Sequence, residues 1–271
     1  MGTSMPAEFS FSYFLPFLMT TSVFAAPIWQ DEFKQPVGTG PDPTKWVHDV
    51  GDNGWGNKEL QTYTTSRENS CVVADPEATD GRALLIKAVR NPTGGYTSAR
   101  LKTHGKFSVR FGRIEARLKL PRGQGIWPAF WMLGDNIDQV PWPACGEIDI
   151  VELIGHQPGT LYGTLHGPGY SGQHGISKST VLPANAEFSQ AYHVFSVDWK
   201  PGKIEWLLDG KIYHTLTPAN LPAGTAWVFD EMSGFLLLNL AIGGLWPGYP
   251  DATTQFPQEY RIDYIRVYEH R

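Results

Sequence analysis

Short runs of strand-forming residues, each ended by a tight-turn signal, constrain the fold of this chain most strongly. Residues 194–199, 204–208 and 211–214 are rich in apolar, aromatic and β-branched side chains. Pro201-Gly202 separates the first two runs, and Asp209-Gly210 separates the second from the third. Two-residue turns of this kind join neighbouring antiparallel strands. The segment therefore predicts an antiparallel meander.

The rest of the chain from about Trp29 onward has the same character, with no sustained apolar recurrence at helical spacing. Residues 83–89 and 235–242 are continuous apolar runs, which is typical of strands buried between two stacked sheets. A last strand is predicted over residues 260–268, and a change in the phase of alternation at Gly112 predicts a bulge or a corner. The fold class is therefore all-β.

Domain organisation follows from length and from the lack of internal boundaries. A β-sandwich commonly reaches 271 residues as one unit, and we find no repeat, low-complexity tract or linker after residue 27. Residues 27–271 are expected to form one domain. Residues 11–26 are apolar, end in small residues and are too short for a comfortable membrane span.

We therefore interpret residues 1–26 as a secretory signal peptide and expect secretion. The segment before this apolar stretch lacks Lys and Arg and contains Glu8, so a tag or an incorrectly assigned start is the alternative. The two cysteines, Cys71 and Cys145, cannot form a disulfide framework, and the sequence does not show whether they pair.

Charge and composition narrow the class of partner. The formal net charge is −5 and there is no run of Lys and Arg, which excludes a nucleic-acid binder. We expect a monomer with no stable membrane association. The chain has 10 Trp and 11 Tyr, whose flat apolar faces suit sugar rings, although part of this set will pack in a sandwich core.

Three acids lie close together in residues 146–153, which read GEIDIVEL. In a strand, Glu147 and Asp149 share a face, whereas Glu152 falls on the opposite one. One extra residue in a bulge near Ile150-Val151 returns Glu152 to the face of the other two. Like-charge repulsion disfavours this arrangement unless at least one acid keeps its proton.

Such a cluster suits a retaining glycosidase, in which one carboxylate attacks the anomeric carbon and a second carboxyl protonates the leaving oxygen. On this interpretation Glu147 is the nucleophile, Asp149 modulates its protonation, and Glu152 is the general acid and then the base. The alternative is a solvated strand face with three surface acids.

Aromatic residues surround the acidic strand in the sequence. Trp127 and Trp131 are four residues apart, so in a strand they share a face and could stack on sugar rings. Trp142 precedes Glu147 by five residues. His166 follows the strand, and its chemistry alone fits a structural role as well as a functional one.

At this point the chain resembles glycoside hydrolase family 16, in particular its laminarinase-like bacterial endo-β-1,3-glucanases. The resemblance rests on NGWGNKELQTYT (residues 53–64), YTSARLKTHGKF (96–107), GRIEARLKLP (112–121), WPAFWMLG (127–134), WPACGEIDIVE (142–152) and GTLHGPGY (163–170). It implies a β-jelly roll of two curved antiparallel sheets with an open concave substrate cleft. It also implies the roles given above for Glu147, Asp149 and Glu152, with the extra bulge residue favouring laminarin.

The same resemblance supplies candidate binding residues. It implies that the glucosyl subsites on the non-reducing side of the scissile bond are lined by Asn57, Arg100, Trp127, Trp131 and His166, with Trp142 and Asn239 as weaker candidates. It further implies a structural calcium ion away from the cleft, held by two backbone carbonyls and one carboxylate at Glu32, Gly81 and Asp263, and no cofactor for catalysis. Carbonyl and carboxylate oxygens are the ligands that calcium prefers.

Three alternative functions stay open at this point. The first is a β-1,3-1,4-glucanase or a broad β-glucanase, and the second is a non-catalytic β-glucan-binding protein on the same fold. Intact Glu147 and Glu152 argue for catalysis over simple binding. The third is a metal-dependent hydrolase using His166 and His174, but these histidines lack the usual ligand spacing.

Overall fold

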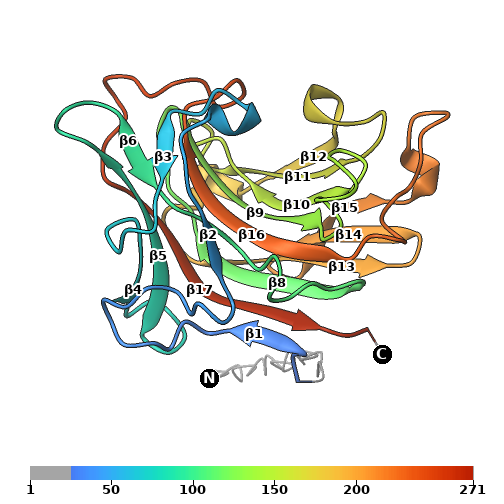
Figure 1. The fold of residues 1–271 in the computed structure, drawn as a ribbon, viewed down its shortest axis with the longest axis horizontal. Coiled ribbons are helices and arrows are strands. Elements are labelled where there is room, and N and C mark those ends of the chain that lie inside the picture. Colours follow the sequence, from blue (N-terminus) through green and yellow to red (C-terminus); the bar gives the residue numbers. More distant parts are fainter. Residues whose placement is uncertain (1–25, 271) are drawn as a thin grey trace, which may run out of the picture.

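Two stacked β-sheets make up the part of the chain that the computed structural model describes, residues 26–270 (Figure 1). One sheet has seven strands in the order β12-β11-β10-β9-β16-β7-β2. Their bounds are β2 (Val47–Asp49), β7 (Arg100–Lys102), β9 (Ile126–Gly134), β10 (Glu147–Glu152), β11 (Thr160–His166), β12 (Ile176–Val181) and β16 (Gly234–Ile242).

The other sheet has ten strands, with the path β15-β14-β13-β8-β17-β5-β6-β3 and with β1 and β4 paired to β17 and β5. Its strands are β1 (Trp29–Asp31), β3 (Gln61–Tyr63), β4 (Ser70–Ala74), β5 (Arg82–Arg90), β6 (Tyr96–Ser98), β8 (Gly112–Lys119), β13 (His193–Lys200), β14 (Lys203–Leu208), β15 (Lys211–Leu216) and β17 (Gln258–Tyr268). Short 3-10 turns occur at η1 (Gly54–Gly56), η2 (Gly172–His174), η3 (Pro183–Asn185) and η4 (Pro218–Asn220).

The predicted all-β class is confirmed, and so is the meander, because β13 pairs with β14 and β14 with β15, both antiparallel. Neighbouring described strands are antiparallel except for the parallel pair β3 and β6. The long apolar runs became β5 and β16, and every residue of β16 is buried. The hydrophobic core fills the space between the two sheets and includes the fully buried Trp199 and Trp206.

The predicted corner at Gly112 marks the start of β8. In the preceding segment, residues 107–111, Val109 alone pairs with a strand, through an isolated bridge to Gly234. Gly112 has φ +124°, and a Cβ at this position would lie 2.5 Å from the carbonyl oxygen of Tyr268. A residue with a side chain would therefore collide with the backbone of β17.

Some predictions fall outside the described residues or concern single side chains. The predicted signal peptide lies outside the described residues, apart from Ala26. Cys71 and Cys145 are both free thiols, so they do not pair with each other. Between residues 26 and 270, none of the helical turns has the length and apolarity needed to cross a membrane.

Candidate active site

The acidic strand β10 lies between β11 and β9 in the seven-stranded sheet (Figure 1). It contains the predicted bulge. Glu147 and Asp149 pair in regular register with residues of β9 and β11, and both registers then shift before Glu152. The extra residue places Glu152 opposite Tyr162 of β11, while Glu147 is opposite His166. The bulge therefore returns Glu152 to the face of Glu147, as the spacing predicted.

Hydrogen-bond donors approach each glutamate from neighbouring elements. The Nε1–H of Trp142 donates to Oε2 of Glu147 over 2.5 Å. The Nε1–H of Trp127 donates to Oε1 of Glu152 over 3.2 Å. Because these donors stabilise the charged carboxylates, they set the orientation of both groups and oppose their protonation.

His166 lies between the first two acids. Its Nε2 is 3.2 Å from Oδ2 of Asp149 and 3.9 Å from Oε1 of Glu147. His166 is thus part of the carboxyl cluster and not a separate structural histidine. Asp149 is buried, and its Oδ2 accepts no hydrogen bond from the described residues.

Burial and mutual repulsion raise the pKa of all three acids. Loss of solvent, followed by the charge of Asp149, raises the pKa of Glu147 to about 8. Loss of solvent raises the pKa of Glu152 to about 7, with the charge of Glu147 adding to the effect and His166 opposing it. Burial and the charge of Glu152 raise the pKa of Asp149 as well. At neutral pH the cluster therefore holds fewer than three negative charges, and its protons are shared among the group.

The predicted substrate-binding residues lie along the same face of the sheet. Trp131 donates from Nε1 to Oδ1 of Asn239 over 2.7 Å. The guanidinium of Arg100 stacks on Trp131, 4.8 Å from its ring centre, and forms an ion pair with Asp49 over 3.0 Å. These contacts, with Trp127 on the same strand as Trp131, confirm that the two tryptophans share a face and that Arg100 and Asn239 adjoin it.

Asn57 lies in the loop just after η1, where its carbonyl accepts a hydrogen bond from the N–H of Leu245. The Nδ2 of Asn57 donates to Oε1 of Glu59 over 3.2 Å, and Glu59 also accepts from Gln61 and Tyr63. Tyr63 in turn contacts Asn239. Asn57 is therefore linked to the sugar-binding candidates through Glu59, which the sequence did not identify.

Two further aromatic residues adjoin Glu152 and were also missed from the sequence. Trp246 packs edge-on against Trp127 with ring centres 5.6 Å apart, and Tyr162 packs edge-on against Trp246 at 5.1 Å. Trp246 is 41% exposed, so part of its ring is open to a ligand. The three rings form an aromatic wall beside Glu152, which we call the Trp246 wall.

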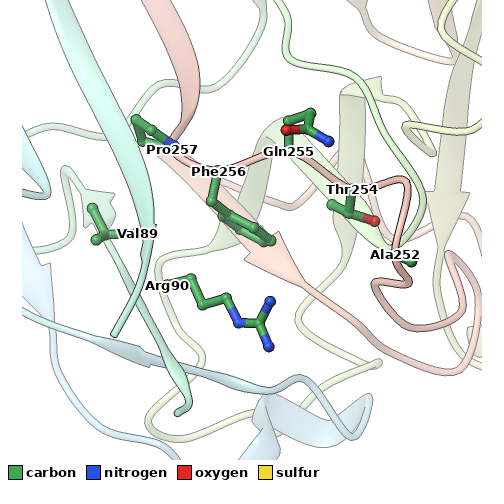
Figure 2. Close-up of a pocket in the computed structure, with 7 residues that line it drawn as sticks. All are labelled: Val89, Arg90, Ala252, Thr254, Gln255, Phe256 and Pro257. Carbon is green, nitrogen blue, oxygen red and sulfur yellow. The ribbon is translucent and has the colours of Figure 1, made fainter. Parts of the chain in front are cut away.

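Two surface hollows lie away from these residues. One is lined by Val89, Arg90, Ala252, Thr254, Gln255, Phe256 and Pro257 (Figure 2). The second lies next to it, around Arg122, His156 and Glu187. Neither contains a predicted site residue, so neither hollow is part of the carboxyl cluster.

The predicted calcium ligands are two backbone carbonyls and the carboxylate of Asp263, and the chain already engages that carboxylate. Asp263 accepts from the hydroxyl and N–H of Thr79 and forms an ion pair with Arg117. The carbonyl of Gly81 accepts from the N–H of Asp75. The carboxylate of Glu32 pairs with Arg266 through both oxygens, whereas the predicted ligand at Glu32 is its backbone carbonyl. Any calcium ion here would share Asp263 with Arg117, and this site stays a prediction.

Among the described residues, the acidic and histidine side chains gathered closely enough to hold a metal are Glu147, Asp149 and His166. His174 lies in η2 and does not join this group. The two-histidine site of a metal-dependent hydrolase is therefore not assembled within the described part of the chain.

The sequence model of the glycosyl hydrolases family 16 matches residues 57–266, which contain the whole carboxyl cluster and most of both sheets. The chain belongs to this family, and the predicted resemblance is confirmed. It is a glycoside hydrolase with the jelly-roll fold.

Individual relatives point to β-glucans. The chain is 39% identical to a beta-glucanase of Rhodothermus marinus, with 89% of this chain and 84% of the relative aligned. It is 37% identical to glucan endo-1,3-beta-glucosidase A1 of Niallia circulans, covering 90% of this chain but only 38% of that longer protein. The laminarinase catalytic domain of Thermotoga maritima MSB8 is 47% identical with a TM-score of 0.81, over 90% of this chain and 98% of that one.

Proposed function

We propose that this β-glucan hydrolase is a secreted, retaining endo-β-1,3-glucanase that cuts internal bonds of laminarin-type glucans. The observation that carries the proposal is the bulge in β10, which brings Glu147 and Glu152 to one face beside Asp149. The laminarinase and endo-1,3-glucosidase names of the relatives support the β-1,3 linkage. The apolar stretch of residues 11–26 supports secretion.

In the first step Glu147, as the carboxylate, attacks the anomeric carbon and forms a covalent glycosyl-enzyme. Glu152 donates its proton to the glycosidic oxygen, and the leaving chain departs as an alcohol. In the second step Glu152 takes a proton from water, which displaces Glu147 from the sugar. Both inversions together retain the β-configuration.

The surroundings of the two glutamates support these roles. Glu147 receives a hydrogen bond from Trp142 and lies near His166, and both favour the charged form that a nucleophile needs. Burial and the charge of Asp149 outweigh these contacts and raise the pKa of Glu147 to about 8, so the charged form is a minor one at neutral pH. Burial keeps the pKa of Glu152 at about 7, so a proton is available near neutral pH. The charge of Asp149 opposes ionisation of Glu147, which fits a residue that modulates protonation.

The residues along the outer face of the sheet would bind the glucan on the non-reducing side of the cut. Trp131, Arg100, Asn239 and Asn57 form a connected series of contacts on one side of Glu147. The Trp246 wall stands beside Glu152 and includes Trp127, so it would line the same non-reducing side of the cut as this series. Aromatic faces stack on pyranose rings without needing a fixed hydrogen-bond pattern.

The calcium ion predicted at Glu32, Gly81 and Asp263 is proposed only as a structural ion, supported by the oxygen chemistry of these groups. No step of the reaction uses it. We propose that the enzyme acts as a monomer without stable membrane association.

A broad or mixed-linkage β-glucanase is the second candidate, because the name of the Rhodothermus relative does not specify a linkage. Initial rates on laminarin and on lichenan separate the candidates, and we expect laminarin to be cut faster. Proton NMR of the first minutes of hydrolysis should show the β-anomer at new reducing ends. A faster rate on lichenan would reject laminarin as the preferred substrate, and an initial α-anomer would reject the retaining mechanism.

A further inference from the structure

Among the described residues, a side-chain hydrogen bond links the ten-stranded sheet to the acidic strand of the other sheet. Trp206 of β14 is fully buried in the core, and its Nε1–H donates to the backbone carbonyl of Asp149 over 2.7 Å. The bond reaches the underside of β10, opposite the face that presents the carboxyl cluster. Trp206 therefore contacts the catalytic strand without reaching the substrate face.

The accepting carbonyl belongs to the residue at which the bulge of β10 begins. Asp149 is the last residue before the registers with β9 and β11 both shift. In a regular sheet, strand carbonyls point along the sheet toward neighbouring strands. A carbonyl that accepts from the opposite sheet is turned out of that plane, which is what a bulge does to its backbone. Trp206 thus holds the backbone where the bulge begins.

The indole is itself held in place on two sides. A Cβ on Gly163 of β11 would lie 2.5 Å from Cδ1 of Trp206, so the absence of a side chain there lets the ring lie against the strand. The imidazole of His214 stacks on the ring, with centres 4.8 Å apart and planes 27° apart. The donor has little freedom to follow the carbonyl if the bulge shifts.

We propose that Trp206 is a positioning residue that fixes the bulge and thereby the spacing of the Glu147 and Glu152 carboxyls. The proposal rests on the function given above, since this spacing matters through the two-step reaction. Trp206 touches neither substrate nor reacting atoms. It acts through the backbone of Asp149.

The test compares two buried tryptophans that differ in one respect. Trp206→Phe removes the N–H that holds the bulge, whereas Trp199→Phe removes an Nε1–H that bonds to none of the described residues. We expect kcat on laminarin to fall about 10- to 100-fold for Trp206→Phe, because misplacement on the order of 1 Å is that costly. KM should stay within about twofold in both variants, and kcat of Trp199→Phe should stay near that of the unmodified enzyme.

The pH profile separates positioning from general loss of structure. Without this hydrogen bond the three carboxyls can move apart, which weakens their mutual repulsion and lowers their pKa values. We therefore expect both limbs of the kcat profile of Trp206→Phe to move to lower pH. The profile of Trp199→Phe should not move. Equal kcat, KM and pH profiles in the two variants would overturn the proposal.

Two further measurements keep the test decisive. If Trp206→Phe does not fold, Gly163→Ala keeps the indole but pushes against it, and unchanged kcat in that folded variant overturns the proposal.

If the unmodified enzyme hydrolyses no β-glucan, the proposed function fails. The carboxyl titration of carbon-13-labelled Glu and Asp then decides the inference, because it needs no substrate. Identical titrations in Trp206→Phe and Trp199→Phe overturn it, and a shift to lower pH in Trp206→Phe alone supports it.

Discussion

Buried acids occur in both sheets, and their partners differ completely. On the seven-stranded sheet, Glu147, Asp149 and Glu152 lie beside one another and His166, without a paired Arg or Lys among the described residues, and burial raises the pKa of each. On the ten-stranded sheet, Asp263 and Asp75 are each paired with an arginine. The clustered acids of the seven-stranded sheet therefore repel one another, whereas arginines neutralise Asp263 and Asp75 on the ten-stranded sheet.

Asp75 shows how the compensation works. Burial alone would raise its pKa, but hydrogen bonds from Arg261 and Tyr192 outweigh burial and hold the pKa below its usual value. Acids of this kind favour folding once they ionise, whereas the clustered acids oppose it. The comparison teaches that catalytic chemistry is concentrated where the fold is electrostatically strained, and stability where it is not.

The largest expected effect is that of Glu147→Gln on turnover. Turnover should fall by about 10³-fold or more, because the nucleophile is lost. The same change should raise the melting temperature, since the raised pKa of Glu147 contributes stability below about pH 4.5 that is lost as pH rises toward about 8. The gain should therefore be larger at pH 8 than at pH 5.

Calorimetry at the two pH values, with Glu68→Gln on the exposed surface as the control, measures this. A lower melting temperature of Glu147→Gln at pH 8 would show that the cluster is not strained, and the comparison between the two faces would fail.

Arg117→Ala tests the other face. It leaves the buried carboxylate of Asp263 without its cation, so we expect a loss of about 3 kcal/mol in the free energy of unfolding. The exposed pair Arg122 and Glu187 provides the control, because Arg122→Ala should cost less than about 1 kcal/mol. Urea unfolding gives both values, and kcat at 25 °C should be unchanged in both variants. A large fall in kcat of folded Arg117→Ala would mean that the two faces are not functionally separate.

Asp149→Asn should have a milder effect on turnover than Glu147→Gln. The change removes the charge that, after burial, contributes most to the raised pKa of Glu147. The acidic limb of the kcat/KM profile, which follows ionisation of Glu147, should therefore move to lower pH. A limb that stays in place or moves to higher pH would exclude Asp149 as the residue that modulates Glu147.

Chelation should have the smallest effect. If calcium shares Asp263 with Arg117, then EDTA lowers the melting temperature by a few degrees, and the initial rate at 25 °C is unchanged. Differential scanning calorimetry with and without added calcium measures the shift. Immediate loss of turnover at a temperature where the protein stays folded would move the metal into the active site and contradict the proposal.

Much of the architecture was predictable because it depends on local patterns. Alternation and turn chemistry predicted the meander of β13 to β15 and the buried strands β5 and β16. The five-residue spacing of Glu147 and Glu152 predicted the bulge, since only an extra residue returns both acids to one face. The four-residue spacing of Trp127 and Trp131 likewise predicted their shared face.

The remaining contacts join residues that are distant in the sequence. Trp246 reaches Trp127 across 119 positions, and Arg117 meets Asp263 across 146. No local period reports such pairs, because they depend on the order of strands in each sheet and on loop paths. Glu59 was missed for a related reason, since only its surroundings by Asn57, Gln61 and Tyr63 distinguish it from a surface acid.

The central claim is that Glu147 attacks and Glu152 transfers protons, and azide rescue tests it most directly. With an activated aryl β-glucoside, Glu147→Ala leaves room for azide to attack from the nucleophile's side, which gives the α-glycosyl azide. Glu152→Ala still forms the glycosyl-enzyme on Glu147, and azide then displaces it with net retention to the β-glycosyl azide. Proton NMR of the two adducts should therefore show α for Glu147→Ala and β for Glu152→Ala. The reverse assignment would make Glu152 the nucleophile, and full activity in both variants would place the reaction away from β10.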